Sequence, residues 1–510
     1  MAEETKPADR KAGALDVARM RELGGEFGND RANVVAANAS TTNGSLKAAT
    51  SFAGERALPR TFNTELKMAS ITNQRQSGRC WMFAGLNMLS YELMHAWNLD
   101  NFEFSETYLY YWVTLEKANM YLEYVIETID EPSDSRVFQT INEEPGADGG
   151  WWQLFADLVA KYGLMPKDAF PECANSMDSG AFKQYLGRKL HIFAAELRKA
   201  RAAGADVDVL RGMKDDDMTV VQRMVAINLG IPPEKFDVLL RVKDGSDDDK
   251  KNDSSARTGA NSSAAADATA DGADANAKAA ADEADALGTP KNGTDERKQL
   301  VEHGIAPREF VKKYVPCDIH DFVQLCNCPM ESTPYYKRYA IKYSRSIADA
   351  EDITFLNLPL DVFRKAAVDQ LKAGHPVYFC CDCHQFALRK EGYFSQDVVR
   401  VDQLYGTDFA LDKADSLEYF ESPSNHAMAI TGVEVGDDGE PLRWKIENSW
   451  GEDNGEKGFY VASADWFDSF VNEIIIKKDY LDDKALAALA EPAVEIEPWA
   501  PLSLACGMSD

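Results

Sequence analysis

Cys80 is the side chain whose position in the sequence best suits it to chemistry. A thiol is a strong nucleophile as a thiolate, and a helix N-terminus or a nearby imidazolium lowers its pKa. The turn-forming residues Ser77, Gly78 and Arg79 precede it, and an apolar stripe with three- and four-residue steps follows it. That stripe consists of Met82, Phe83, Leu86, Leu89, Leu93 and Trp97. The pattern predicts a helix buried on one face that begins at Cys80, with positive charge from Arg79 nearby.

Gln74 can provide the second group that acyl transfer requires. A tetrahedral intermediate needs hydrogen-bond donors aimed at its oxyanion, commonly one backbone N–H beside the nucleophile and one side-chain amide. Gln74 lies shortly before Cys80 and can supply the amide. Taken alone, a cysteine at the start of a helix is more often an inert buried thiol. The interpretation therefore depends on the residues that accompany Cys80.

The segment ITNQRQSGRCWMF, residues 71–83, resembles the active-site segment of papain-like cysteine peptidases. The second half of that signature is a His at the edge of an apolar strand, and an Asn followed by Ser-Trp-Gly on the next strand. His426 in SNHAMAITGV and Asn448 in ENSWGEDNGEKGFY meet both conditions. Three separate segments therefore carry the resemblance.

The resemblance implies a role for each of these side chains. Cys80 is the nucleophile, and Gln74 donates to the oxyanion. His426 forms an ion pair with Cys80 and later protonates the leaving amine, while Asn448 holds the imidazole in the tautomer that both steps need. The other six histidines lack such neighbours in the sequence and are expected to lie on the surface or in the core.

Supporting residues follow from the same resemblance. Trp450 is expected to shield the His–Asn pair, and Trp81 supports the nucleophile that it directly follows. Asp148-Gly149-Gly150 resembles the glycine-rich turn that pairs with an extended substrate in papain-like clefts, so Gly149 and Gly150 are predicted to bind substrate. The same residues also suit a helix N-terminus capped by Asp148.

The elements that position these groups differ between the two halves of the chain. Helical patterns dominate residues 100–240, whereas short β-prone runs dominate the later part. These runs are 377–381, 427–435, 442–448, 458–462 and 473–478. The sequence predicts an α+β enzyme with its active site between a helical layer and a sheet. The resemblance implies a papain-like fold whose second layer is an antiparallel, barrel-like sheet and which carries large helical insertions.

The expected organisation has six segments. The stretch between about 244 and 290 is rich in Ala, Asp, Ser, Asn and Gly, with no aromatic residue, and is predicted to be a disordered acidic loop. The segments are an N-terminal arm (1–60), a helical half with the catalytic Cys (61–243), the loop (244–290), a continued helical insertion (291–370), a β-rich half with His and Asn (371–488), and a C-terminal arm into the cleft (489–510).

Composition restricts the class of protein. In 510 residues, hydrophobic side chains make up 45% and aromatic ones 10%, as in a globular enzyme. The net charge of −29 argues against nucleic acid or an anionic membrane as a partner. The start, MAEETKPADRKAG, lacks the apolar run of a signal peptide, and no run of about 18 apolar residues follows. A cytoplasmic location is therefore expected.

The nine cysteines do not suggest a secreted disulfide framework. Several are near neighbours, such as Cys326 with Cys328, and reduced thiols are expected. A zinc site from Cys380, Cys381, Cys383 and His384 is an alternative because thiolates and imidazole bind zinc, but the paired C-x-x-C spacing is missing. No metal and no cofactor are predicted.

Longer segments narrow the resemblance to one branch. FSETYLYYW, DGGWWQLFADLVAKYGLMPKDAFPE and EIEPWAPL together resemble the bleomycin hydrolase and aminopeptidase C family, over most of the chain outside the loop and the N-terminal arm. That resemblance implies a homohexamer with active sites facing an internal channel and a C-terminal arm in each chain's own cleft. The terminal carboxylate, on Asp510, would face the ammonium of a peptide substrate and favour exopeptidase action.

The function predicted on this basis is a cysteine aminopeptidase, with bleomycin-hydrolase-like amide hydrolysis possible. The alternative within the same chemistry is a papain-like endopeptidase or aminoacyl transferase. A catalytically idle binding protein with this fold is the alternative from another class, and it predicts loss of a member of the catalytic set. All four members, Cys80, His426, Asn448 and Gln74, are present.

Overall fold

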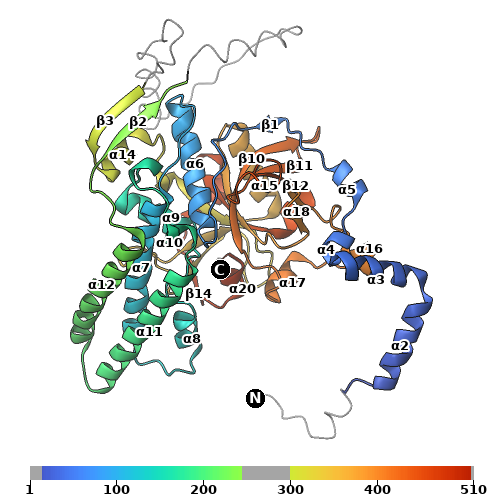
Figure 1. The fold of residues 1–510 in the computed structure, drawn as a ribbon, viewed down its shortest axis with the longest axis horizontal. Helices are drawn as coiled ribbons and strands as arrows, with labels where there is room; N and C mark the ends of the chain where they lie inside the picture. Colours follow the sequence, from blue (N-terminus) through green and yellow to red (C-terminus); the bar gives the residue numbers. More distant parts are fainter. Residues whose placement is uncertain (1–13, 244–298, 507–510) are drawn as a thin grey trace, which may run out of the picture.

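The computed structural model describes residues 14–243 and 299–506. The N-terminal part contains four helices, of which the first two extend away from the body of the molecule while the other two lie along it (Figure 1). No residue of the first two is buried, so they belong to no core. The four are α2 Val17–Asn29, α3 Arg31–Asn43, α4 Ser45–Ala48 and α5 Phe52–Ala57. The predicted loop, 244–290, lies outside the described residues.

The first half of the body is helical, as predicted. Its helices and its one short strand are β1 Thr64–Glu65, α6 Cys80–Ala96, α7 Glu106–Glu127, α8 Arg136–Asn142, α9 Trp152–Tyr162, the 3-10 turn η1 Lys167–Ala169, α10 Ala174–Met177, α11 Gly180–Ala202 and α12 Val207–Leu229. The long helices α7, α11 and α12 form one side of the molecule, and α6 lies between them and the sheet (Figure 1).

The second half carries most of the strands. Its elements are β2 Phe236–Arg241, β3 Gln299–Ile305, α14 Pro307–Tyr314, η3 Ile319–Asp321, β4 Phe322–Cys326, β5 Lys337–Ile341, β6 Thr354–Asn357, α15 Leu360–Lys372, β7 Val377–Cys381, β8 Ala387–Leu388, β9 Tyr393–Phe394, α16 Val401–Tyr405, α17 Lys413–Glu418, β10 His426–Val435, β11 Pro441–Glu447, β12 Phe459–Ser463, α18 Ala464–Phe470, β13 Val471–Lys477, η4 Lys478–Tyr480, α19 Asp483–Leu489, β14 Val494–Ile496 and α20 Pro501–Cys506. The architecture is α+β.

A 12-stranded sheet orders these strands as β14-β5-β6-β4-β13-β7-β10-β11-β12-β9-β8, with β1 paired to β10. At the centre, β10 runs antiparallel to β7 and β11, and His426 lies opposite Cys381. The five predicted strands correspond to β7, β10, β11, β12 and β13 within two residues at each end. No helix in the described ranges is both long and apolar enough to cross a bilayer.

Two structural expectations need correction. Helix α6 is not buried on one face only, because every residue from Cys80 to Met94 is buried. Its sequence is apolar almost all round, which suits a helix held between a helical layer and a sheet. Residues 291–370 were expected to be helical, but their described part contains the four strands β3–β6 as well as the α-helices α14 and α15. A short buried run such as β4 cannot be distinguished from a helix segment by periodicity alone.

Candidate active site

Cys80 is the first residue of α6 and is 4% exposed. Helix α6 packs against β7 and β10, so Cys80 shares an apolar cluster with Cys380 of β7 and with Ala427, the neighbour of His426. Backbone N–H groups at a helix start have no intrahelical partner and carry partial positive charge. A charge on Cys80 would act on Cys380 and Cys381, and Cys381 lies opposite His426, so Cys80 meets the sheet at the end where His426 begins β10.

His426 and Asn448 are held together by a side-chain hydrogen bond. His426 Nε2 lies 2.8 Å from Asn448 Oδ1, which also accepts the backbone N–H of Ser449 at 2.7 Å. The second contact fixes which amide atom is the oxygen. Since that oxygen can only accept, Nε2 carries the proton and Nδ1 is left to exchange one. Asn448 is the first residue after β11, which ends at Glu447.

Trp450 covers this pair. Its ring stacks on that of His426 with centroids 4.6 Å apart and planes 24° from parallel. The guanidinium of Arg389 also contacts this ring and lies 5.2 Å from its centre. Burial and the charge of Arg389 together lower the pKa of His426 to about 4, although the hydrogen bond with Asn448 opposes the shift. The sequence analysis missed Arg389, for which no motif provides a signal.

Gln74 is fixed between the two halves of the site. Its Oε1 accepts from the Ser449 hydroxyl at 2.7 Å, and its backbone N–H donates to the Ser449 carbonyl at 2.8 Å. Its Nε2 donates one hydrogen to the carbonyl of Ser77 at 2.7 Å, which leaves the second amide hydrogen for another acceptor. Ser449 was not predicted as a site residue, although it stands inside the Asn-Ser-Trp-Gly motif.

Gly451 permits the close approach of these segments. Its φ is +78°, and a Cβ there would lie 2.4 Å from Nδ2 of Asn73. Asn73 forms an isolated antiparallel bridge with Trp450. A glycine is therefore needed for both conformation and space where the Gln74 loop meets the Asn448 loop.

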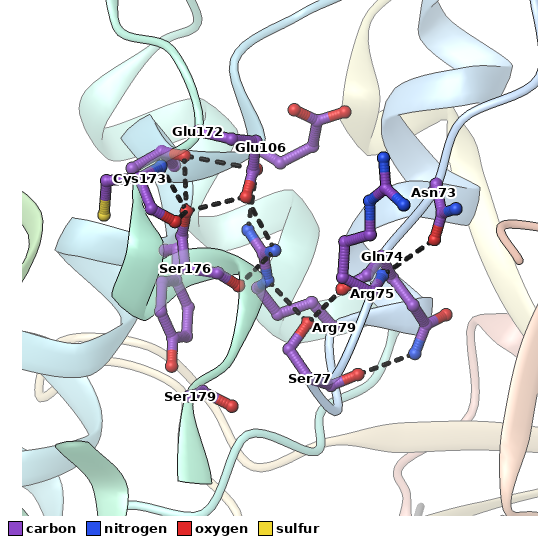
Figure 2. A network of polar contacts seen from close by, with 12 residues as sticks. Asn73, Gln74, Arg75, Ser77, Arg79, Glu106, Glu172, Cys173, Ser176 and Ser179 are labelled. Carbon is purple, nitrogen blue, oxygen red and sulfur yellow. Dashed lines mark hydrogen bonds and ion pairs between the residues drawn. The ribbon is translucent and has the colours of Figure 1, made fainter. Parts of the chain in front are cut away.

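The helical side of Cys80 is held by a charged network, which Figure 2 shows around Arg79. Arg79 is fully buried and donates to both carboxylate oxygens of Glu172, each at 3.0 Å, and to the Ser176 carbonyl at 2.6 Å. Its Nε donates to the Ser77 hydroxyl at 2.9 Å. Burial raises the pKa of Glu172, but hydrogen bonds and the charge of Arg79 outweigh this and lower it. The positive charge expected beside Cys80 is thus neutralised by a carboxylate, as burial of a guanidinium demands.

Asp148 is a second anchor of the same side. Its carboxylate accepts from Tyr110 at 2.8 Å, from the Gly78 N–H at 3.3 Å and from the Ser179 hydroxyl, and it pairs with Lys183 at 3.1 Å. Burial raises its pKa, but Lys183 and these hydrogen bonds lower it to about 2. Asp148 does not cap α9, since the N-cap position is Trp151 and makes no side-chain cap.

The position of Trp81 requires a glycine at residue 150, in the turn that was predicted to bind substrate. Its Nε1 donates to the Asp148 carbonyl at 2.9 Å, and a Cβ on Gly150 would lie 2.6 Å from the indole ring. Gly149 O accepts from Lys117, and Gly149 lines a hollow of about 580 Å³. Pro498 and Leu504 of the C-terminal segment line the same hollow.

The C-terminal segment also lies beside the His426 strand. Strand β14 pairs in parallel with β5, and α20 follows it. The carbonyl of Ala505 accepts from the backbone N–H of Ser424 at 3.0 Å, two residues before His426. Asp510, predicted to anchor substrate, lies outside the described residues.

The alternative zinc ligands on β7 and beyond do not converge. Cys380 belongs to the cluster on the α6 side, whereas Cys381 and Cys383 belong to the cluster on the other face of the sheet. The side chain of His384 is 63% exposed. None of the nine cysteines, all of which lie among the described residues, forms a disulfide.

Comparisons with known proteins identify the family of this chain. The Peptidase C1-like family matches residues 14–258 and 292–503. Aminopeptidase C of Streptococcus thermophilus is 33% identical over 91% of this chain and 93% of its own length. Aminopeptidase E of Lactobacillus helveticus is 33% identical over 96% of this chain and 99% of its own. The crystal structure of PepW from Lactobacillus rhamnosis HN001 is 31% identical, covers 96% of this chain and 99% of its own, and superposes with a TM-score of 0.83. This chain therefore belongs to the Peptidase C1-like family of cysteine peptidases.

Proposed function

We propose that this protein is a cysteine aminopeptidase, a peptide hydrolase that removes N-terminal residues through a thioester intermediate. The observation that carries the proposal is the His426–Asn448 hydrogen bond of 2.8 Å at the end of the sheet that faces the start of the Cys80 helix. The relatives named Aminopeptidase C and E align over more than nine tenths of the chain.

The chemistry assigned to these groups has two halves. The Cys80 sulfur attacks the scissile carbonyl carbon while its proton resides on Nδ1 of His426, and the resulting oxyanion accepts from Gln74 and the Cys80 N–H. The C–N bond then breaks as His426 gives its proton to the leaving amine. Water, deprotonated by His426, hydrolyses the thioester and restores the thiol.

The ion pair must overcome the low proton affinity of His426. Burial lowers the pKa of the isolated imidazole to about 4, so an imidazolium there is costly without a nearby anion. A Cys80 thiolate supplies that anion, and each charge then stabilises the other. Asn448 contributes by keeping the protonated Nε2 occupied.

Selectivity for free amino termini is assigned to the C-terminal segment. It shares the hollow beside Gly149, and α20 touches the residues that lead to His426. A carboxylate on the chain end, Asp510, can pair with a substrate ammonium and block binding of a longer chain. Gly149 and Gly150 are proposed to contact the substrate backbone, and Trp81 and Trp450 to pack around the reacting groups.

Free and N-acetylated aminoacyl amides test this proposal directly. A cysteine aminopeptidase hydrolyses the free amides and leaves the acetylated ones intact. Equal hydrolysis of both would favour the endopeptidase, and transfer of the aminoacyl group to an added amine in preference to water would favour the transferase. A chain shortened to end at Ile496 loses α20 and moves its terminal carboxylate away from the hollow, so it should accept acetylated substrates if that carboxylate sets the register. If the shorter chain still hydrolysed only the free amides, the C-terminal segment would not determine the selectivity for free amino termini.

Several further properties are proposed in addition to membership of the family. We infer bleomycin-hydrolase-like amide hydrolysis, a cytoplasmic location, a barrel-like curvature of the sheet, and helical insertions between its two catalytic halves. A homohexamer is supported by α2, whose Val17, Met20 and Phe27 are between 45% and 61% exposed. Such an apolar face suits burial against another copy. Light scattering on the full chain should give six subunits, and a monomer would contradict this.

A further inference from the structure

Three buried sulfurs meet beneath the C-terminal helix. Cys326 ends β4, Cys328 follows in the next loop, and Cys506 ends α20. All three residues are 0% exposed, and their sulfur atoms lie within 4.8 Å of one another. The catalytic set makes no use of them. Segments far apart in the sequence thus bring three soft ligands to one point.

The spacing of these sulfurs suits a shared metal ion. Sulfurs bound tetrahedrally at a Zn–S distance of about 2.3 Å lie about 3.8 Å apart. The Cys328 and Cys506 sulfurs are 3.9 Å apart. A disulfide needs a separation of about 2.05 Å, which would require the two segments to move toward each other.

The surroundings balance the charge of such a site. Three thiolates and one divalent cation leave a single negative charge. Lys413 is within electrostatic reach of Cys328, and its ammonium donates to Asn327 Oδ1 at 3.1 Å and to the Val471 carbonyl at 2.7 Å. This buried cation therefore neutralises the remaining charge, which a dry interior requires.

Asn357 orders the ligand loop. Its Oδ1 accepts from the backbone N–H of Cys328 at 2.9 Å and lies 3.7 Å from the sulfur of Cys326, while its Nδ2 donates to the Cys328 carbonyl at 2.8 Å. Partners of this kind orient metal ligands and limit their motion. The fourth position of a tetrahedral site is left to this amide oxygen, which lies 3.7 Å from the Cys326 sulfur, or to a water molecule.

We propose that Cys326, Cys328 and Cys506 bind one thiophilic divalent cation, with Zn²⁺ as its natural probe, and that this ion fastens α20 to the sheet. Because the carbonyl of Ala505 accepts from Ser424, the ion fixes the chain next to the lead-in to His426. The site stands on its own geometry and does not depend on the catalytic proposal.

Metal content of the full-length protein tests this inference. Cys80 and His426 could bind zinc themselves, so the chain carries Cys80→Ser throughout. After incubation with Zn²⁺ and dialysis, about one ion per chain is expected. Co²⁺ in its place should give the intense near-ultraviolet absorption of thiolate ligation. Cys326→Ser, Cys328→Ser and Cys506→Ser should each lower zinc affinity at least tenfold, whereas Cys317→Ser, which removes a thiol outside the cluster, should not.

A second measurement uses the protein with all three cysteines intact, so its result does not depend on whether the serine variants fold. Amide hydrogen exchange in α20 of the unaltered cluster should slow at least tenfold on addition of Zn²⁺, while exchange in α12 stays unchanged. Absence of bound zinc, or retention of it by all three serine variants, would overturn the site. An intact mass lower by two hydrogens, traced to a Cys328–Cys506 bond, would also overturn it, since the thiols would then be partners in a disulfide.

Discussion

The two sides of Cys80 are built from different chemistry. On the sheet side, buried His426 and Asn448 share a hydrogen bond that leaves one ring nitrogen to exchange a proton, and the partly buried Trp450 stacks on the His426 ring. On the helical side, Arg79 and Glu172 form a buried ion pair whose hydrogen-bonding groups have partners. A side chain that exchanges a proton during the reaction needs one hydrogen-bonding atom without a permanent partner. A side chain that holds a loop in place is most effective when all its hydrogen-bonding atoms have partners. The sheet side is therefore suited to reaction and the helical side to position.

Removal of the nucleophile gives the largest expected effect. Cys80→Ala should abolish hydrolysis of aminoacyl amides because no other group can form the thioester. Its fold should survive, since only one sulfur atom is lost. Turnover numbers and circular dichroism measure both outcomes, with Cys173→Ala as the control that keeps activity. Substantial turnover by Cys80→Ala would refute the assignment.

Loss of the oxyanion donor comes next. Gln74→Ala should lower kcat by about 10²–10³, the usual loss for one such donor. Gln76→Ala, an exposed amide in the same loop, is the matched control and should change kcat little. A rise in KM with unchanged kcat would instead make Gln74 a contact to the bound substrate.

The helical side should respond in stability. Arg79→Met removes the ionic partner of the Glu172 carboxylate, which is 14% exposed and keeps hydrogen bonds from Ser176 and Thr107, so the cost is at most about 3–5 kcal/mol of unfolding free energy, the range for a fully buried pair. Arg75→Met removes a guanidinium from the same loop without breaking a buried ion pair and should change it by less than about 0.5 kcal/mol. Denaturant unfolding distinguishes the two, and Arg79→Met together with Glu172→Gln should recover part of the loss. If Arg79→Met and Arg75→Met had equal unfolding free energies, the Arg79–Glu172 ion pair would not contribute to stability.

The smallest effect is expected at Arg389. Its charge disfavours an imidazolium on His426, so Arg389→Gln should raise the pKa of His426. Since activity needs the protonated imidazole, the alkaline limb of kcat/KM should move to higher pH, by less than about one unit. Lys390→Gln, the neighbouring exposed cation, is the control. A shift to lower pH, or the same shift in both variants, would contradict the assigned direction.

The candidate site residues that could be predicted from the sequence are those that belong to local motifs. Residues 71–83 and the His and Asn segments each combine a chemical group with a local element, so both type and position could be predicted. Arg389 lies against the face of Trp450 and within electrostatic reach of His426, and the Arg79–Glu172 pair joins segments that only the folded chain brings together. Neither contact has a periodicity or motif from which it could be inferred.

The fold was predictable for a similar reason. Alternating and apolar runs located β7 and β10–β13, but β4 and β6 are mostly buried runs of five and four residues, in which no periodicity separates a strand from a helix. The convergence of Cys326, Cys328 and Cys506 was equally hidden, since the near pair in the sequence gives no sign of its distant third member.

The division of labour around Cys80 is tested most directly by its reactivity toward iodoacetamide as a function of pH. Alkylation of Cys80 is followed by peptide mass spectrometry in the wild type, in His426→Gln and in Arg79→Met. An ion pair with His426 predicts rapid alkylation of the wild type well below the ordinary thiol pKa of about 8.5, and loss of this acidic reactivity in His426→Gln. Folded Arg79→Met should retain it. Unchanged reactivity in His426→Gln, or its loss in folded Arg79→Met alone, would contradict the claim that the sheet side activates the thiol.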